Sequence, residues 1–287
     1  MPKPAVVRRT KGPVQDLEEH LPAEWWRGLF NANYLKTDGD VVEDPRNTRQ
    51  DIDLVLDAVP LHPVDAVLDL CCGQGRHCLE LARRGFRNLT GIDQSGYLIA
   101  LARKRARVQG ADIAFRRADI RSCSLARGAY RCILMLGNSF GYFEREQDDV
   151  AVLGSVRDAL APGGSLILDL TDGDWVRGAY QPRTWEWIGP KEFVCRERCL
   201  SADRSRLVAR EVITHAERGV IADQFYAERL YSRAGITALL ERAGFAGICD
   251  RGNVQSDSAR NQDLGMMAQR MFLVAQTAKA LVRAAVR

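Results

Sequence analysis

The stretch VLDLCCGQGRH, residues 67–77, is a short apolar run that leads into two closely spaced glycines. Apolar residues followed at once by Gly73 and Gly75 are typical of a buried strand that turns into a helix. Glycines at such a turn leave room for a ligand beside the backbone and the helix N-terminus. The stretch therefore predicts a ligand loop at the carboxyl end of the first strand of an open α/β sheet.

The cysteines and the histidine around this loop do not predict a metal site. Cys71, Cys72, His77 and Cys78 show neither a Cys-x-x-Cys nor a His-x-x-x-His spacing. Adjacent residues of a strand point to opposite faces, so Cys71 and Cys72 are poorly placed to share one ion. We expect small buried side chains, a packing role for His77 and no bound metal.

The loop is also a poor match to the dinucleotide fingerprint Gly-x-Gly-x-x-Gly. Cys78 occupies the place of the third glycine, which allows close packing of helix on strand. Asp69, at the end of the strand, can accept a hydrogen bond from a ligand ammonium group, which a dinucleotide does not offer there. The loop therefore favours another ligand over a nicotinamide cofactor.

Strands and helices alternate regularly after this stretch. This alternation predicts a doubly wound, mostly parallel sheet with helices on both faces. The expected strands of a seven-stranded sheet are 65–70, 88–93, 112–119, 130–137, 165–172, 246–253 and 268–276, and the expected helices are 75–85, 95–110, 145–164 and 233–245.

Three further segments surround the core, which we assign to residues 63–172 and 233–287. Residues 1–13 carry three prolines without apolar periodicity and are predicted to form a mobile arm. Residues 14–62 are predicted to form an N-terminal helical cap. Residues 173–232 show loose two-residue alternation between turn residues, which predicts an antiparallel β insertion that covers the substrate.

Composition narrows the classes of partner. The net charge is only +4 and the arginines are scattered, so a nucleic-acid partner is not indicated, although the cluster at 103–105 keeps it open. No apolar run approaches the roughly 20 residues of a membrane helix, and the N-terminus lacks a secretory pattern. Dispersed cysteines indicate reduced thiols and a cytoplasmic location. A homodimer is one option for the oligomeric state.

Six motifs, in order over about 65–277, resemble the class I S-adenosylmethionine-dependent methyltransferases of the small-molecule type. VLDLCCGQGRH resembles their first motif, hydrophobic-hydrophobic-x-Asp-x-x-x-Gly-x-Gly. The other five are LTGIDQS (the second strand with its acidic end), RRADI (the third strand with its adenine-binding Asp), LMLGNSFGYF (the fourth strand and active-site loop), ALAPGGSLILDL (the fifth strand with its turn) and LLERAGF (the lead into the sixth). The resemblance implies a Rossmann-like fold and S-adenosylmethionine as cofactor.

The cofactor is expected at the carboxyl ends of these strands. Asp93 follows Gly75 by 18 positions, and its carboxylate can take both ribose hydroxyls; the alternative is a helix N-cap, for which Ser95 competes. The resemblance implies that Asp119 lies near the adenine amino group; the alternative is a turn residue. The expected cofactor-binding residues are Asp69, Cys71, Gly73, Gly75, Asp93, Gln94, Asp119, Ile120, Gly137 and Asn138.

Methyl transfer from a sulfonium is an in-line displacement, in which the protein chiefly supplies proximity and alignment. A general base is needed only if the acceptor must lose its proton early. The candidate catalytic residues are Asn138, His215 and Tyr226, and the candidate substrate residues are Phe140, Tyr142, Trp185, Arg229 and Asp263. His215 is the best base by residue type, although a lone strand histidine is more often structural.

The sequence as a whole predicts a methyltransferase that acts on oxygen or nitrogen of a small molecule. The loop after the fourth strand lacks the Asn/Asp-Pro-Pro-Tyr/Phe signature of polar-amide and base N-methyltransferases, which argues against glutamine, adenine or cytosine. The alternatives are an RNA or protein methyltransferase, with an open basic face, and a non-catalytic cofactor-binding partner subunit. An aromatic segment over 25–34 is predicted either to cover the cofactor or to cap the sheet.

Overall fold

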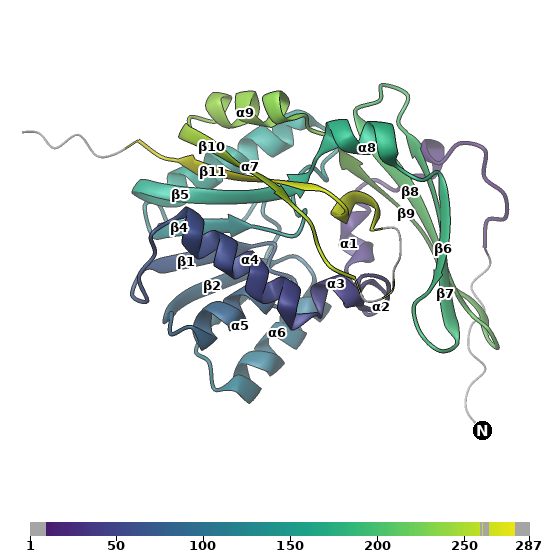
Figure 1. Cartoon of the computed structure of the whole chain (residues 1–287), viewed down its shortest axis with the longest axis horizontal. Helices are drawn as coiled ribbons and strands as arrows, with labels where there is room; N and C mark the ends of the chain where they lie inside the picture. Colours follow the sequence, from purple (N-terminus) through teal and green to yellow (C-terminus); the bar gives the residue numbers. More distant parts are fainter. Residues whose placement is uncertain (1–9, 259, 261–263, 279–287) are drawn as a thin grey trace, which may run out of the picture.

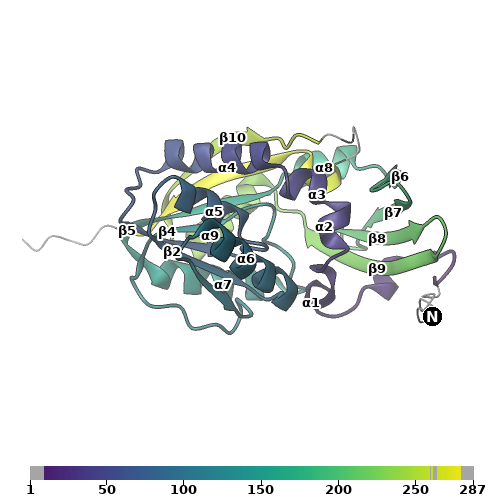
Figure 2. The same cartoon turned by 90° about the horizontal axis from the view of Figure 1, so that it is seen from below.

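The computed structural model describes residues 10–258, 260 and 264–278 and contains two β-sheets (Figure 1). A seven-stranded sheet is flanked by helices, and a separate four-stranded sheet lies beyond the carboxyl ends of its parallel strands. The short helices α1 (Trp26–Leu29), α2 (Tyr34–Thr37) and α3 (Gly39–Val42) lie between the two sheets in both views (Figures 1 and 2).

The large sheet has the strand order β10-β11-β5-β4-β1-β2-β3. The first five strands in the sequence run parallel, and β11 pairs antiparallel with both β5 and β10. The strand order reverses between β1 and β4, the place where doubly wound sheets bind ligands. The strands are β1 (Ala66–Leu70), β2 (Asn88–Asp93), β3 (Ala114–Arg117), β4 (Tyr130–Met135), β5 (Leu160–Thr171), β10 (Ala246–Val254) and β11 (Arg270–Gln276). The predicted mostly parallel, seven-stranded sheet is confirmed.

Alternate side chains of each strand pack on opposite faces of this sheet. Val67 of β1 joins a core with α4 (Pro45–Ala58) and α5 (Arg76–Arg83). Leu68 joins the opposite core, with α7 (Glu146–Ala159) and α9 (Arg233–Arg242). The remaining core helix, α6 (Gly96–Gln109), packs on Phe115 of β3.

Two elements differ from the sequence-based expectation. The helix expected over 145–164 ends at Ala159, because Leu160 already pairs with Tyr130 of β4. The insertion begins with an unpredicted helix, α8 (Gly173–Ala179), which the Asp172 side chain caps by accepting hydrogen bonds from two backbone N–H groups.

The insertion otherwise forms the predicted antiparallel sheet. Its strands run in the order β6 (Arg183–Trp187), β7 (Glu192–Leu200), β8 (Arg206–His215) and β9 (Gly219–Arg229). Of the segment predicted to be a mobile arm, residues 1–9 lie outside the described residues. Thr10 and Lys11 both donate hydrogen bonds to the Asp223 carboxylate of β9, so the first described residues lie against this sheet.

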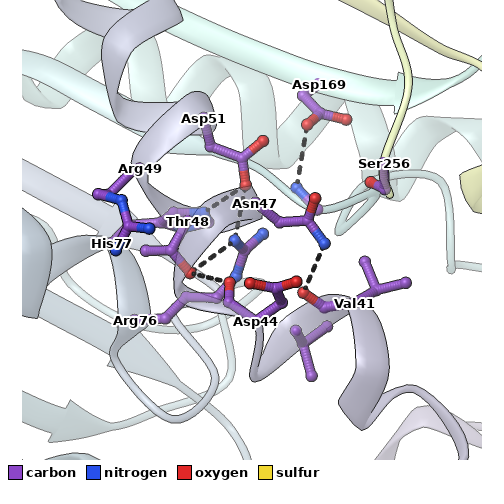
Figure 3. Close-up of polar contacts among 12 residues, drawn as sticks. Val41, Asp44, Asn47, Thr48, Arg49, Asp51, Arg76, His77, Asp169 and Ser256 are labelled. Carbon is purple, nitrogen blue, oxygen red and sulfur yellow. Dashed lines mark hydrogen bonds and ion pairs between the residues drawn. The ribbon is translucent and has the colours of Figure 1, made fainter. Parts of the chain in front are cut away.

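The N-terminal helices are joined to the core by a buried charged network (Figure 3). Asp51 of α4 lies 2.6 Å from Arg76 Nη1, 3.2 Å from His77 Nε2 and 3.6 Å from Arg270 Nη2. Arg270 of β11 also pairs with Asp169 of β5. Burial opposes the ionisation of Asp51. The charge of Arg76 above all, with the hydrogen bond to His77 and the charge of Arg270, lowers the pKa of Asp51. Burial, reinforced by Arg76, lowers the pKa of His77 to about 4, so its ring is neutral at pH 7.

None of the helices in the described part of the chain combines the length and the apolar character needed to traverse a lipid bilayer.

Replacing Asp51 with alanine is expected to lower the free energy of unfolding by about 3–5 kcal/mol, because Arg76 and Arg270 would lose a buried counter-charge. Asp53→Ala is the matched control on the same helix. The Asp53 side chain is 63% exposed and pairs with Arg84 at the surface, so its loss should cost at most about 1 kcal/mol. Urea unfolding measures both, and equal values for the two variants would contradict a stabilising network.

Candidate functional site

A cavity of about 190 Å³ lies where the carboxyl ends of β1, β2 and β4 meet the N-terminal helices and the four-stranded sheet. The cavity therefore occupies the point at which the strand order reverses. The sequence-predicted residues that line it are Cys71, Gly73, Asp93, Gln94, Asp119, Ile120, Gly137, Asn138, Phe140, Tyr142 and Tyr226.

The loop after β1 has an unusual backbone. Cys71, Gly73 and Gly75 all have positive φ, at 63°, 54° and 79°. A Cβ on Gly75 would lie 2.7 Å from the Phe115 ring, so both the conformation and the packing require glycine there. Cys71 adopts the same left-handed region with a side chain, a strained state that commonly occurs at ligand sites.

Asp93, at the end of β2, holds this loop in place. Its Oδ2 accepts a hydrogen bond from Gly73 N at 2.8 Å, and its Oδ1 accepts one from Ser95 N at 2.7 Å. The Ser95 side chain caps α6 by accepting from Leu98 N. The N-cap of this helix is therefore Ser95, which leaves Asp93 as a cavity-lining carboxylate.

The N-terminal helices cover the next part of the cavity. Gln94 Nε2 donates to the Trp26 carbonyl at 2.6 Å, and Ser95 Oγ donates to the Phe30 carbonyl at 2.6 Å. Asp119 accepts hydrogen bonds from both Arg121 and Arg27, and the bond from Arg121 lowers the pKa of its carboxyl. These contacts make the segment over 25–34 a cover of the cavity.

Asn138 connects three elements behind the loop after β4. It has a positive φ of 59°, which asparagine tolerates better than most residues. Its side-chain oxygen accepts from Thr171 N at 2.9 Å, and its amide nitrogen donates to the Glu228 carboxylate of β9. Its carbonyl accepts a 2.5 Å hydrogen bond from the Tyr142 hydroxyl. Asn138 thereby joins the large sheet to the insertion.

The insertion contributes a charged wall that sequence reasoning missed, apart from Tyr226. These side chains are Arg196 and Arg198 of β7, Glu211 of β8, and Gln224 and Glu228 of β9, with Asp38 facing them from the N-terminal helices. Strand alternation places 196 with 198, and 224 with 226 and 228, on one face of the sheet. Such alternating charges usually mark a solvent face, and only the position of the sheet over the cavity shows that they point inward.

Two of the predicted residues on the insertion lie away from the cavity. His215 ends β8, and its Nδ1 accepts from the backbone N–H groups of Glu217 and Arg218, so the ring closes the β8–β9 turn. Trp185 lies on the edge strand β6, is 65% exposed and packs against Trp187. The expected catalytic role of His215 and the expected substrate contact of Trp185 therefore find no support in their positions.

Three others lie behind the cavity wall. Arg229 donates to the Phe143 and Glu144 carbonyls and therefore holds the loop after β4. Asp69 lies beneath its own loop, where burial raises the pKa of its carboxyl to about 7, and Gly75 packs on Phe115. Asp263 lies outside the described residues.

Within residues 10–258, 260 and 264–278, no group of three or more His, Cys, Asp and Glu side chains is arranged to hold a metal ion. The side chains that line the cavity include carboxyl, amide, guanidinium, thiol, hydroxyl and aromatic groups.

Comparisons with known proteins identify the core. Residues 67–164 match the family model of a methyltransferase domain. The chain is 31% identical over 126 residues to the demethylmenaquinone methyltransferase of Thermus thermophilus, which covers 44% of this chain and 54% of that protein. It is 28% identical over 138 residues to the glycine/sarcosine N-methyltransferase of Halorhodospira halochloris, which covers 48% of this chain and 51% of that protein. The chain thus spans about half the length of the curated relatives it matches.

A solved structure extends the likeness of the fold beyond this core. The S-adenosylmethionine-dependent methyltransferase of Clostridium acetobutylicum superposes with a TM-score of 0.65 at 18% identity, which covers 82% of this chain and 92% of that one. The match to the family model begins at Val67, the first residue of the glycine-containing stretch 67–77. Residues 67–164 of this chain are therefore a methyltransferase domain, and the chain has the fold of an S-adenosylmethionine-dependent methyltransferase.

Proposed function

We propose that the protein transfers a methyl group from S-adenosylmethionine to an oxygen or nitrogen atom of a small molecule. The observation that carries the proposal is a single covered cavity, with Asp93 and Asp119 at the family's cofactor loops and a charged wall on β7, β8 and β9. One cavity that joins a cofactor end to a second polar end suits a two-substrate reaction.

The residues present fit the proposed cofactor. Asp93 would accept hydrogen bonds from the ribose hydroxyls, since each of its oxygens has a further lone pair beside the backbone N–H that it already accepts. Ser139 Oγ is buried at the cavity wall and has no hydrogen-bond partner among the described residues, so a ligand group would satisfy it. Gly73 leaves the backbone open to the ligand.

The cofactor would supply a methyl carbon whose bond to the sulfonium sulfur breaks as the acceptor's lone pair attacks. The chain's own contribution is alignment of the two partners. Phe140 and Tyr142 line the cavity beside Asn138, and we propose that they border the transferred group. Tyr226 of β9 also lines the cavity, and we propose that it orients the acceptor.

A small acceptor fits this site better than RNA or a protein segment. Trp25, Phe30 and Tyr34 of the N-terminal segment line the cavity. An enzyme that acts on RNA or protein would instead need an open face at this place. The two relatives described above carry names that specify small acceptors, demethylmenaquinone and glycine or sarcosine. Both observations support a compact substrate enclosed by the protein.

We propose the cytoplasm as the compartment in which this reaction occurs. All eight cysteines are unpaired in the structure, and unpaired thiols in a chain of this size are typical of a reducing compartment.

Replacing Asp93 with alanine is expected to weaken binding of S-adenosylhomocysteine by about 100-fold, because two charge-assisted hydrogen bonds to the ribose would be lost. Calorimetric titration measures this change, and circular dichroism checks that the variant folds. Asp112→Ala, at an exposed position just before β3, serves as the control with unchanged affinity.

A wild-type protein that binds neither S-adenosylmethionine nor S-adenosylhomocysteine would refute the proposed function. Binding without transfer of labelled methyl to any component of a small-molecule extract would instead support a non-catalytic partner subunit.

A further inference from the structure

Glu228 is a buried carboxyl group at the cavity wall without a cationic partner. It is 7% exposed and lines the cavity from β9. Among the described residues, Asn138 Nδ2 is the group that donates a hydrogen bond to its carboxylate. No Lys, Arg or His of this part of the chain lies within ion-pair distance of it.

The cations of the same wall are already engaged by the protein. Arg196 pairs with Glu186 and lies 3.9 Å from the Glu211 carboxylate. Arg198 donates to the Gln181 carbonyl and to Thr184 Oγ1. Glu228 therefore offers a ligand a carboxyl group that these two arginines do not engage.

The charged and titratable groups around Glu228 do not compensate it. Burial, together with the nearby Asp38, raises the pKa of Glu228 to about 8, despite the hydrogen bond from Asn138. The charged and titratable groups that share the cavity with it are Asp38, Glu211, Arg196, Arg198, Tyr34, Tyr142 and Tyr226, and, at the loops of the large sheet, Cys71, Cys72, Arg76, His77, Asp93 and Asp119.

A carboxylate in such a place favours a ligand that carries a cation or a hydrogen-bond donor, because an unpaired buried charge is costly. An anionic ligand group at this point would be repelled. Aromatic rings reinforce the preference, since Trp25 lies 5.0 Å from Tyr142 and 5.9 Å from Tyr226 between ring centroids. Rings of this kind attract organic cations through their faces.

We infer that the methyl acceptor is a small primary or secondary amine whose nitrogen is bound by Glu228 opposite the cofactor loops, an assignment that rests on the proposed methyl transfer. Asn138 is a positioning residue, because it holds the Glu228 carboxylate while Thr171 N holds its own side chain.

In the proposed methyl transfer, Glu228 acts as the general base. The carboxylate takes a proton from the bound ammonium group, which leaves a lone pair on nitrogen. That pair forms the new nitrogen–carbon bond, the carbon–sulfur bond breaks, and its electrons remain on sulfur. The positive charge thus passes from sulfur to nitrogen, and the product leaves as a methylated ammonium.

The unpaired state of Glu228 predicts a pH effect on stability that Glu228→Gln should abolish. Folding raises the pKa of this carboxyl from 4.5 to about 8, so its contribution to stability is fully present below 4.5 and is lost as the pH rises through 8. The free energy of unfolding of the variant, minus that of wild type, should therefore increase between about pH 4.5 and about pH 8 and level off above it. Urea unfolding measures this difference, and a constant difference would show that a cation already pairs with Glu228.

Matched pairs of amines and alcohols test the acceptor class directly. The probes are benzylamine with benzyl alcohol, cyclohexylamine with cyclohexanol, and glucosamine with glucose, each titrated into the full-length protein saturated with S-adenosylhomocysteine. We expect at least one amine to bind about 10-fold or more tightly than its alcohol, since one charge-assisted hydrogen bond distinguishes them. With S-adenosylmethionine, the same amine should be methylated on nitrogen.

Glu228→Gln should reduce kcat/KM for that amine by about 100-fold through loss of the base and leave the affinity for S-adenosylhomocysteine unchanged. Glu197→Gln is the control. Glu197 stands between Arg196 and Arg198 in β7, so its side chain lies on the opposite face of the sheet, where it pairs with Arg210. Equal activity of Glu228→Gln and wild type, methylation of alcohols but not amines, or binding of no amine by the saturated protein would each overturn the inference. If the wild-type protein does not bind S-adenosylhomocysteine at all, the proposed function itself is refuted.

Discussion

The site depends on one buried carboxylate with three cationic or hydrogen-bonding partners. Asp51 contacts Arg76 and His77, which begin α5 at the end of the glycine loop, and Arg270 of the last strand. Buried charges must be paired, so α4 has one position in which this requirement is met. Because α1–α3 lead directly into α4, the same position places their aromatic side chains over the cavity.

Asn138 provides the second connection, between the large sheet and the insertion. Its amide group satisfies Thr171 N on one side and the Glu228 carboxylate on the other. The positive φ of Asn138 is a strained backbone conformation. The two hydrogen bonds of its side chain, from Thr171 N and to Glu228, stabilise it. The loop after β4 is therefore fixed both to β5 of the large sheet and to β9 of the insertion.

The fold and the loops that line the cavity after β1 and β2 were predictable from local signals. Gly73 and Gly75 after an apolar run, and Asp93 at the next strand end, are determined by short-range backbone and packing requirements. The charged wall on β7, β8 and β9 was not predictable, because the inward direction of Arg196, Glu211 and Glu228 follows from the placement of an entire sheet. Residue type also misled at His215, since an imidazole that accepts backbone hydrogen bonds at a turn cannot be distinguished in sequence from a catalytic one.

The charged wall lies on β7, β8 and β9, apart from the loops after β1 and β2, and this separation has an evolutionary consequence. Side chains of a hairpin sheet can be exchanged without altering the β1 and β2 loops, and effects at sites that share no partners add independently. If the proposed function holds, substitutions on the inward face of these three strands can therefore change the acceptor while the methyl donor stays the same. Asn138 limits this freedom, because it commits β9 to an acceptor of its amide hydrogen at position 228.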